Sequence, residues 1–158
     1  GRRSHGVGSC GGGGLLMAGS GKKLWVPDRR DMIWINHSPH IGQEMPGQHP
    51  LLVLSTKAFN DRTSLVIGLP MTHSTINDDN PFAVKFKGPK GEACYVVSHQ
   101  PKSFDWRTRG PRPHPWKQVP PLIFKEACEG LDSILALLAK RMSYRRVYMR
   151  ATVKEAKR

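Results

Sequence analysis

The chain has 158 residues and a hydrophobic fraction of 38%, which suits one domain with a buried core and excludes a fully disordered protein. Its three cysteines, Cys10, Cys94 and Cys128, are widely spaced, which argues against a disulfide framework or a zinc site and fits a reducing cytoplasm. The net charge of +13 indicates a polyanionic partner.

Most of the positive charge lies at the two ends of the chain. Residues 1–23 carry four basic residues and no acid, residues 140–158 carry eight against Glu155, and residues 24–139 carry 13 against 11 acidic residues. A polyanion contact in the central region must therefore depend on local clustering of charge. Residues 1–23 are rich in glycine and are expected to form a flexible arm, which fits a vector-derived leader as well as a functional arm. Residues 140–158 are expected to be a basic extension.

Neither a membrane-spanning segment nor a signal peptide is expected, because the apolar run over 134–139 is far shorter than the ~20 residues that a spanning helix needs. Short apolar runs between turn residues predict strands at 32–35, 51–54, 64–71, 82–87 and 93–98. Residues 56–62 are expected to hold a helical turn, whereas 38–47, 72–80 and the proline-rich stretch 111–116 are expected to be loops.

A helix is predicted over 119–139, where two prolines suit the first turn and apolar residues recur at helical spacing. Short strands followed by one packing helix predict a mainly β fold with a C-terminal helix, a small barrel of the SH3-like kind.

An ordered set of short segments with matched spacing runs through residues 24–139. It comprises Val26-Pro27-Asp28, Asp31-Met32-Ile33-Trp34-Ile35, Gly42-Gln43-Glu44-Met45-Pro46-Gly47, Pro50-Leu51-Leu52-Val53-Leu54-Ser55, Ala58-Phe59-Asn60, Pro70-Met71-Thr72, Pro81-Phe82-Ala83-Val84, Gln100-Pro101-Lys102-Ser103 and Asp105-Trp106-Arg107-Thr108-Arg109-Gly110. The set resembles the MazF/PemK (Kid) family of toxins. The resemblance implies an SH3-like barrel of the CcdB/PemK type, a homodimer, and a cytoplasmic endoribonuclease that needs neither metal nor cofactor. It also implies an antitoxin whose acidic segment occupies the RNA groove.

In the reaction that this resemblance implies, a ribose 2′-OH attacks the adjacent phosphorus, giving a 2′,3′-cyclic phosphate and a 5′-OH. The reaction needs a base, an acid, and donors where charge builds on the phosphate. Glu44 matches the loop glutamate of the family, a candidate for acid–base or positioning work, and its alternative is a solvated carboxylate. Thr72 matches the threonine that contacts the scissile phosphate, and its alternative is a local side-chain-to-backbone bond.

His49 stands where the MazF branch has its catalytic arginine. A histidine cannot copy the bidentate arginine clamp, but it can act as an acid or a base near neutral pH. His49 therefore either preserves the chemistry by another route, marks a weakened enzyme, or is an ordinary surface histidine. The catalytic positions of the Kid branch read Val97, His99 and Gln43 here, so none of them matches. A metal site formed by His49, His73 and His99 has no spacing signature in its favour.

A basic cluster beside Trp106 suits contact with an RNA backbone, whereas Trp106 itself is expected in the core or in a dimer contact. The residues expected to bind single-stranded RNA are Gln43, His73, His99, Gln100, Lys102, Arg107 and Arg109. Two alternatives stay open besides the endoribonuclease. One is a module of the same fold that binds RNA or an antitoxin without cutting, and the other is a CcdB-like poison of a topoisomerase.

Overall fold

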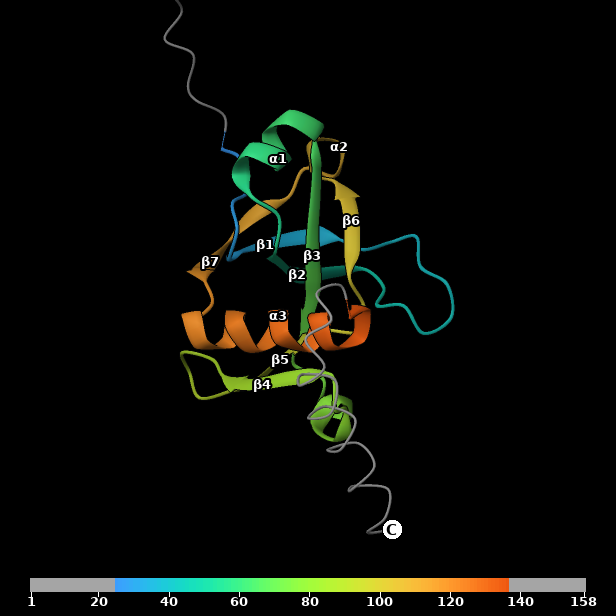
Figure 1. Cartoon of the computed structure of the whole chain (residues 1–158), viewed down its shortest axis with the longest axis vertical. Coiled ribbons are helices and arrows are strands. Elements are labelled where there is room, and N and C mark those ends of the chain that lie inside the picture. The colour runs from blue at the N-terminus through green and yellow to red at the C-terminus, as the bar shows by residue number, and fades with distance from the viewer. Residues whose placement is uncertain (1–24, 137–158) are drawn as a thin grey trace, which may run out of the picture.

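A computed structural model describes residues 25–136 (Figure 1), and the expected arm at 1–23 and extension at 140–158 lie outside this range. The elements in chain order are β1 (Asp31–Asn36), β2 (Gln48–Val53), α1 (Lys57–Thr63), β3 (Leu65–Thr72), the 3₁₀ helix η1 (Thr75–Asp79), β4 (Ala83–Lys87), β5 (Ala93–Val97), β6 (Lys102–Asp105), α2 (Trp106–Arg109), β7 (Arg112–Gln118) and α3 (Pro121–Leu135). The mainly β fold with a C-terminal helix is confirmed. No helix within 25–136 is long and apolar enough to cross a bilayer.

The strands form one antiparallel sheet in the order β4-β5-β3-β2-β1-β7, and β6 joins it through β3. β3 runs through its centre (Figure 1) and pairs with β2 on one edge, while β6 and β5 divide the other edge between them. This division curls the sheet into a half-barrel. Gly68 leaves room for the neighbouring strand, because a Cβ atom at this position of β3 would collide with the carbonyl oxygen of Leu52 on β2.

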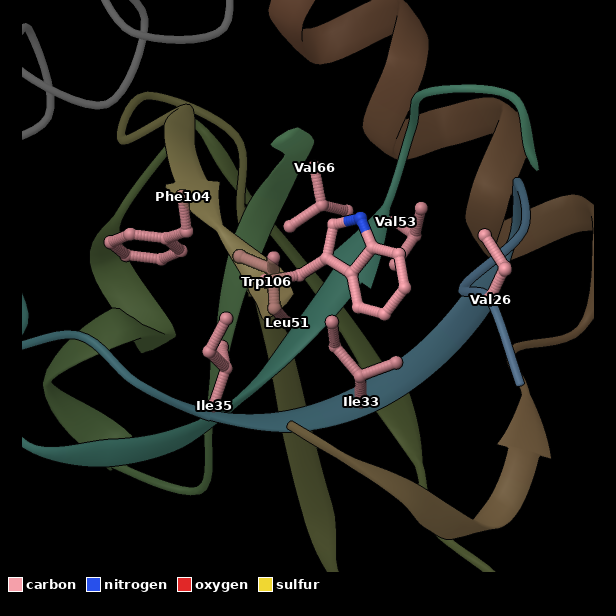
Figure 2. Packing of buried hydrophobic residues seen from close by; sticks show 8 residues of the cluster. All are labelled: Val26, Ile33, Ile35, Leu51, Val53, Val66, Phe104 and Trp106. Atoms are coloured by element: carbon pink, nitrogen blue, oxygen red, sulfur yellow. The ribbon is translucent and has the colours of Figure 1, made fainter. Parts of the chain in front are cut away.

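Each face of the sheet carries its own hydrophobic cluster, as the alternation of side chains along a strand requires. The inner cluster surrounds Trp106 and contains Val26, Ile33, Ile35, Leu51, Val53, Val66 and Phe104 (Figure 2). The other cluster contains Met32 and Leu52 and is covered by α3 through Ala127. Trp106 is 6% exposed and its Nε1 atom donates to the carbonyl oxygen of Asn60 at 2.9 Å. The prediction that Trp106 packs in the core is therefore confirmed.

Residues 112–116 of the proline-rich stretch belong to β7, so the prediction of a loop there was wrong. In the described chain β7 pairs with β1 and with no other strand. An edge strand tolerates proline because the missing N–H can face away from the ladder. Its Trp116 packs against the cluster under α3. The four-residue elements β6 and α2 were not predicted.

The predicted C-terminal helix is confirmed over Pro121–Leu135, but it ends before the expected 139, because Ala136 adopts a left-handed φ of 51° as its C-cap; residues 137–139 lie outside the described range. Gly130 interrupts its apolar pattern for a packing reason. A Cβ atom at this position would stand 3.0 Å from Oγ of Ser98, whose hydroxyl donates to the carbonyl oxygen of Ala127. The small residue lets α3 approach the end of β5.

Candidate active site

An open cleft of about 440 Å³ lies between the loop that follows β1 and the ends of β3 and β5. Glu44, His49 and Thr72 all line it, so the three candidates for catalysis share one cleft. Of the residues expected to bind RNA, Gln43, His99 and Gln100 line it as well. The remaining lining residues are Met45, Pro46, Ser74, Ile76, Asn77, Asn80 and Val97.

The loop between β1 and β2 is held at its base. The backbone N–H of His37 donates to the carbonyl oxygen of Gly47 at 2.7 Å. Arg109 reaches across from α2, and its Nη1 atom donates to the carbonyl oxygens of Asn36 and Ser38 at 2.6 and 2.7 Å. Arg109, expected to bind RNA, does not line the cleft and uses these donors to fix the loop.

Gln100 holds the far side of the same loop. Its Oε1 atom accepts from the N–H of Met45, and its Nε2 atom donates to the carbonyl oxygen of Gln43, both at 3.0 Å. Both ends of the amide are thus occupied within the chain. Gln100, which the sequence predicts to bind RNA, lines the cleft, and its contacts orient the wall that presents Glu44.

Glu44 is an exposed carboxylate with a cationic neighbour. Nζ of Lys102 lies 3.1 Å from its Oε2 atom, which also accepts weakly from the N–H of Ile41 at 3.4 Å. The hydrogen bond from Lys102, followed by the bond from Ile41, lowers the pKa of Glu44 below its ordinary value. Glu44 is therefore ionised at neutral pH, which suits a base or a positioning group and excludes a proton donor.

His49 lies on β2, opposite Ile35 of β1, and its half-buried ring faces a second histidine. The rings of His37 and His49 are nearly perpendicular, with the centroids 6.0 Å apart and the planes at 76°. His37 is 1% exposed, and burial lowers its pKa from 6.5 to about 4, assisted by the positive charges of His49, Lys102 and Arg109. Sequence reasoning missed His37, because a histidine just after a strand looks like an ordinary loop residue.

Thr72 and His99 form the opposite wall. Oγ1 of Thr72 accepts from the N–H of Ser74 at 3.1 Å, the local bond that the alternative interpretation expected, and the hydroxyl can still donate to a ligand. Burial lowers the pKa of His99, whose Nδ1 atom lies 3.5 Å from Nδ2 of Asn80. This wall therefore offers neutral donors and acceptors.

Besides Arg109, three further residues expected to bind RNA stand apart from the cleft lining. Arg107 pairs with Asp61 at 2.6 Å and stacks on Trp106, with its Cζ atom 4.5 Å from the ring centroid. Nδ1 of His73 lies 2.9 Å from the carbonyl oxygen of Ala93. Lys102 reaches the cleft only through Glu44. Within residues 25–136, no group of three or more His, Cys, Asp or Glu side chains is arranged to hold a metal ion.

The curled sheet, the helix across it and the open cleft beside the first loop define a small toxin-type barrel. The chain belongs to the PemK-like, MazF-like toxin family of type II toxin–antitoxin systems, whose family model matches residues 28–135. The resemblance found in the sequence is thereby confirmed.

Relatives of known sequence and structure agree. The chain is 35% identical over 86 residues to the endoribonuclease toxin MazF of Escherichia coli K12, covering 54% of this chain and 75% of the relative. It is 31% identical over 109 residues to the endoribonuclease PemK of Escherichia coli, covering 67% and 80%. A crystal structure of MazF from Deinococcus radiodurans has a TM-score of 0.65 at 31% identity, with 72% of this chain and 100% of that chain covered.

Proposed function

We propose that this protein is the toxin of a type II toxin–antitoxin pair and that it cuts single-stranded RNA in the cleft without a metal ion. The observation that carries the proposal is the convergence of Glu44, His49 and Thr72 on one open cleft. Membership of a family whose relatives are named endoribonucleases supports it. An RNA substrate implies that the protein acts in the cytoplasm.

The proposed reaction assigns one task to each side chain. The carboxylate of Glu44 takes the proton of the 2′-OH as its oxygen bonds to phosphorus, and protonated His49 gives a proton to the departing 5′-oxygen. The hydroxyl of Thr72 donates to the phosphate, where negative charge builds. The products are a 2′,3′-cyclic phosphate and a 5′-OH. Side chains supply both proton transfers, so the scheme needs no metal.

The polar side chains of the cleft also suit single-stranded RNA. Single-stranded RNA can splay its bases and offer their edges to polar side chains. Gln43, Asn77 and His99 provide such groups around the cleft, and Lys102 adds a positive charge beside Glu44. We propose Gln43 and His99 as contacts to RNA. Arg107 and Arg109 contribute by supporting the scaffold.

The proposed partners are an antitoxin with an acidic segment and a second copy of this chain. MazE–MazF complexes from Deinococcus radiodurans include one with a TM-score of 0.58 at 28% identity, which supports an antitoxin partner. Two apolar side chains on the outer face of β3, Leu65 and Ile67, are 39% and 38% exposed, and the exposed Phe59 lies on neighbouring α1. Exposed apolar side chains on neighbouring elements support a self-association surface.

One specific observation favours a second function. His49 replaces the arginine of the MazF branch, and a histidine cannot clamp a phosphate in two places. The protein would then bind RNA or its antitoxin without cutting. No feature of the described residues favours the third alternative, a topoisomerase poison, over the activity of the named relatives.

The deciding experiment incubates the full chain with a long single-stranded RNA in EDTA and maps the new ends. Cleavage that leaves 5′-OH and 2′,3′-cyclic phosphate ends is the expected result, and RNA retention without cleavage would establish the binding module. His49→Ala should lower the rate about a hundredfold or more if His49 is the acid. An unchanged rate would remove His49 from the mechanism, and a faster His49→Arg variant would show that the histidine weakens the enzyme.

A further inference from the structure

His37 is buried next to the cleft in a way that ordinary packing does not explain. Its side chain is 1% exposed, and neither Nδ1 nor Nε2 makes a hydrogen bond of good geometry among the described residues, although the backbone of His49 lies close enough to oppose the lowering of the ring's pKa. Its ring stands 5.1 Å from that of Phe104, centroid to centroid, at 67°. An apolar ring would fit beside Phe104 without leaving two polar atoms unpaired, so the histidine costs folding free energy that a phenylalanine would not.

The geometry shows which group could use the unpaired nitrogens. The rings of His37 and His49 lie on neighbouring chain segments, since β1 and β2 pair Ile35 with His49 and the N–H of His37 bonds to Gly47. Two imidazoles joined by a hydrogen bond of about 3 Å have centroids roughly 5 Å apart. The observed 6.0 Å is about 1 Å longer and the planes are at 76°, so a direct hydrogen bond requires the two rings to move closer and turn.

The charges around His37 decide the direction of that bond. The groups that face it are His49 from β2, Lys102 from β6 and Arg109 from α2, and Glu44 neutralises part of the charge of Lys102. Burial and these positive neighbours keep the His37 ring uncharged at neutral pH, so one ring nitrogen retains its lone pair. His37 is therefore a hydrogen-bond acceptor facing His49.

We propose that His37 is a positioning residue that acts through His49: its free ring nitrogen accepts a hydrogen bond from protonated His49 and turns the other His49 nitrogen toward the cleft. This inference rests on the proposed function. Only the cleft-facing proton of His49 is transferred, to the 5′-oxygen, and the proton that faces His37 stays on His49. The cost of burying an unpaired imidazole is then explained by its use in the reaction.

The test compares two substitutions that differ in one property. His37→Phe fills the space but removes the acceptor, and should lower kcat roughly tenfold with KM unchanged while leaving the protein as stable or more stable. His37→Gln keeps an acceptor and should recover much of the loss. His114→Phe is the matched control, because His114 is also buried but lies outside the cleft lining. Full activity of His37→Phe, or equal loss in both variants, would overturn the inference.

A second measurement separates this inference from the proposed function. Nitrogen NMR of the full chain labelled at histidine, recorded without RNA, should show a nitrogen–nitrogen coupling between the His37 and His49 rings once His49 is protonated. His37→Phe should abolish this coupling. If the wild type cuts no RNA, the proposed function fails while the coupling still decides the histidine pair. If the protein cuts RNA but the two rings show no coupling, the pairing is contradicted.

Discussion

The cleft and the segment 102–109 were both expected to bind RNA, but the side chains of the two regions make different contacts. In the cleft, Glu44, His49 and Thr72 converge on open space. In the segment, Trp106 is in the core and the guanidinium groups of Arg107 and Arg109 bond to carboxylate and carbonyl oxygens. A basic residue beside an aromatic ring is therefore a weak sign of a phosphate contact when oxygen atoms of the same chain already take its N–H groups.

The largest expected effect tests the structural half of this comparison. Trp106→Ala should lower the free energy of unfolding by ~3–5 kcal/mol, because it empties the centre of the inner cluster (Figure 2) and removes the bond to Asn60. Urea denaturation followed by circular dichroism measures the change. Trp116→Ala is the control, since Trp116 is only partly buried and should cost less. A loss below about 1 kcal/mol for Trp106→Ala would show that the segment is not part of the core.

The next largest effect concerns His37, beside the cleft, which makes the free energy of unfolding depend on pH. Its folded pKa of about 4 lies below the ordinary 6.5, so the unfolded chain takes up a proton first as the pH falls. The associated stability is fully present above pH 6.5 and is lost between 6.5 and about 4, by roughly 3 kcal/mol.

Denaturation at pH 7.5 and 4.5 in the wild type and in His37→Phe checks this expectation. Burial also lowers the pKa of His99 and His114, but their contributions are common to both proteins and cancel in the difference. The variant should lose much less stability on acidification. Equal losses in the two proteins would mean that His37 is not the group that titrates.

A smaller effect tests whether the contact between Lys102 and Glu44 tunes the cleft. Lys102→Met removes the hydrogen bond that lowers the pKa of Glu44, so this pKa should rise toward its ordinary value. If RNA cutting needs the carboxylate, the acid limb of the pH–rate profile moves to higher pH. An acid limb at the same pH in both proteins would indicate that Glu44 does not titrate in the reaction.

The smallest effect is expected for Arg107→Ala. Its partner Asp61 is largely exposed, and such surface ion pairs contribute about 0–1 kcal/mol. RNA cutting should change less than about twofold, because the guanidinium contacts Asp61 and Trp106 and no lining residue of the cleft. A tenfold loss of cutting at unchanged stability would indicate that Arg107 contacts RNA, as the sequence predicted.

The sequence predicted those elements whose signal is local. Short apolar runs between turn residues located the strands from β1 to β5, and the apolar stripe behind Pro121 located α3. β7 was missed because a segment rich in proline resembles a loop. Only the structure shows that this segment is an edge strand paired with β1 alone, a position that tolerates proline.

The missing parts of the site depend on contacts between distant segments. His37 is buried by Phe104 of β6, and Gln100 and Arg109 bond to the first loop from far along the chain. No pattern within a short window of sequence could reveal these contacts. The family resemblance supplied Glu44 and Thr72 because their short motifs match position by position, whereas partners across the fold need the structure.

The most direct test is a chemical-shift map of the full chain bound to an RNA whose scissile 2′-OH is replaced by hydrogen, so that it binds but cannot be cut. If the cleft binds RNA, the backbone signals of Gln43, Thr72 and His99 move on binding, together with the ring signals of His49. The signals of Arg107 should stay in place. Large shifts around Arg107, with no change in the signals of the cleft residues, would contradict the assignment of the cleft as the site that holds and cuts RNA.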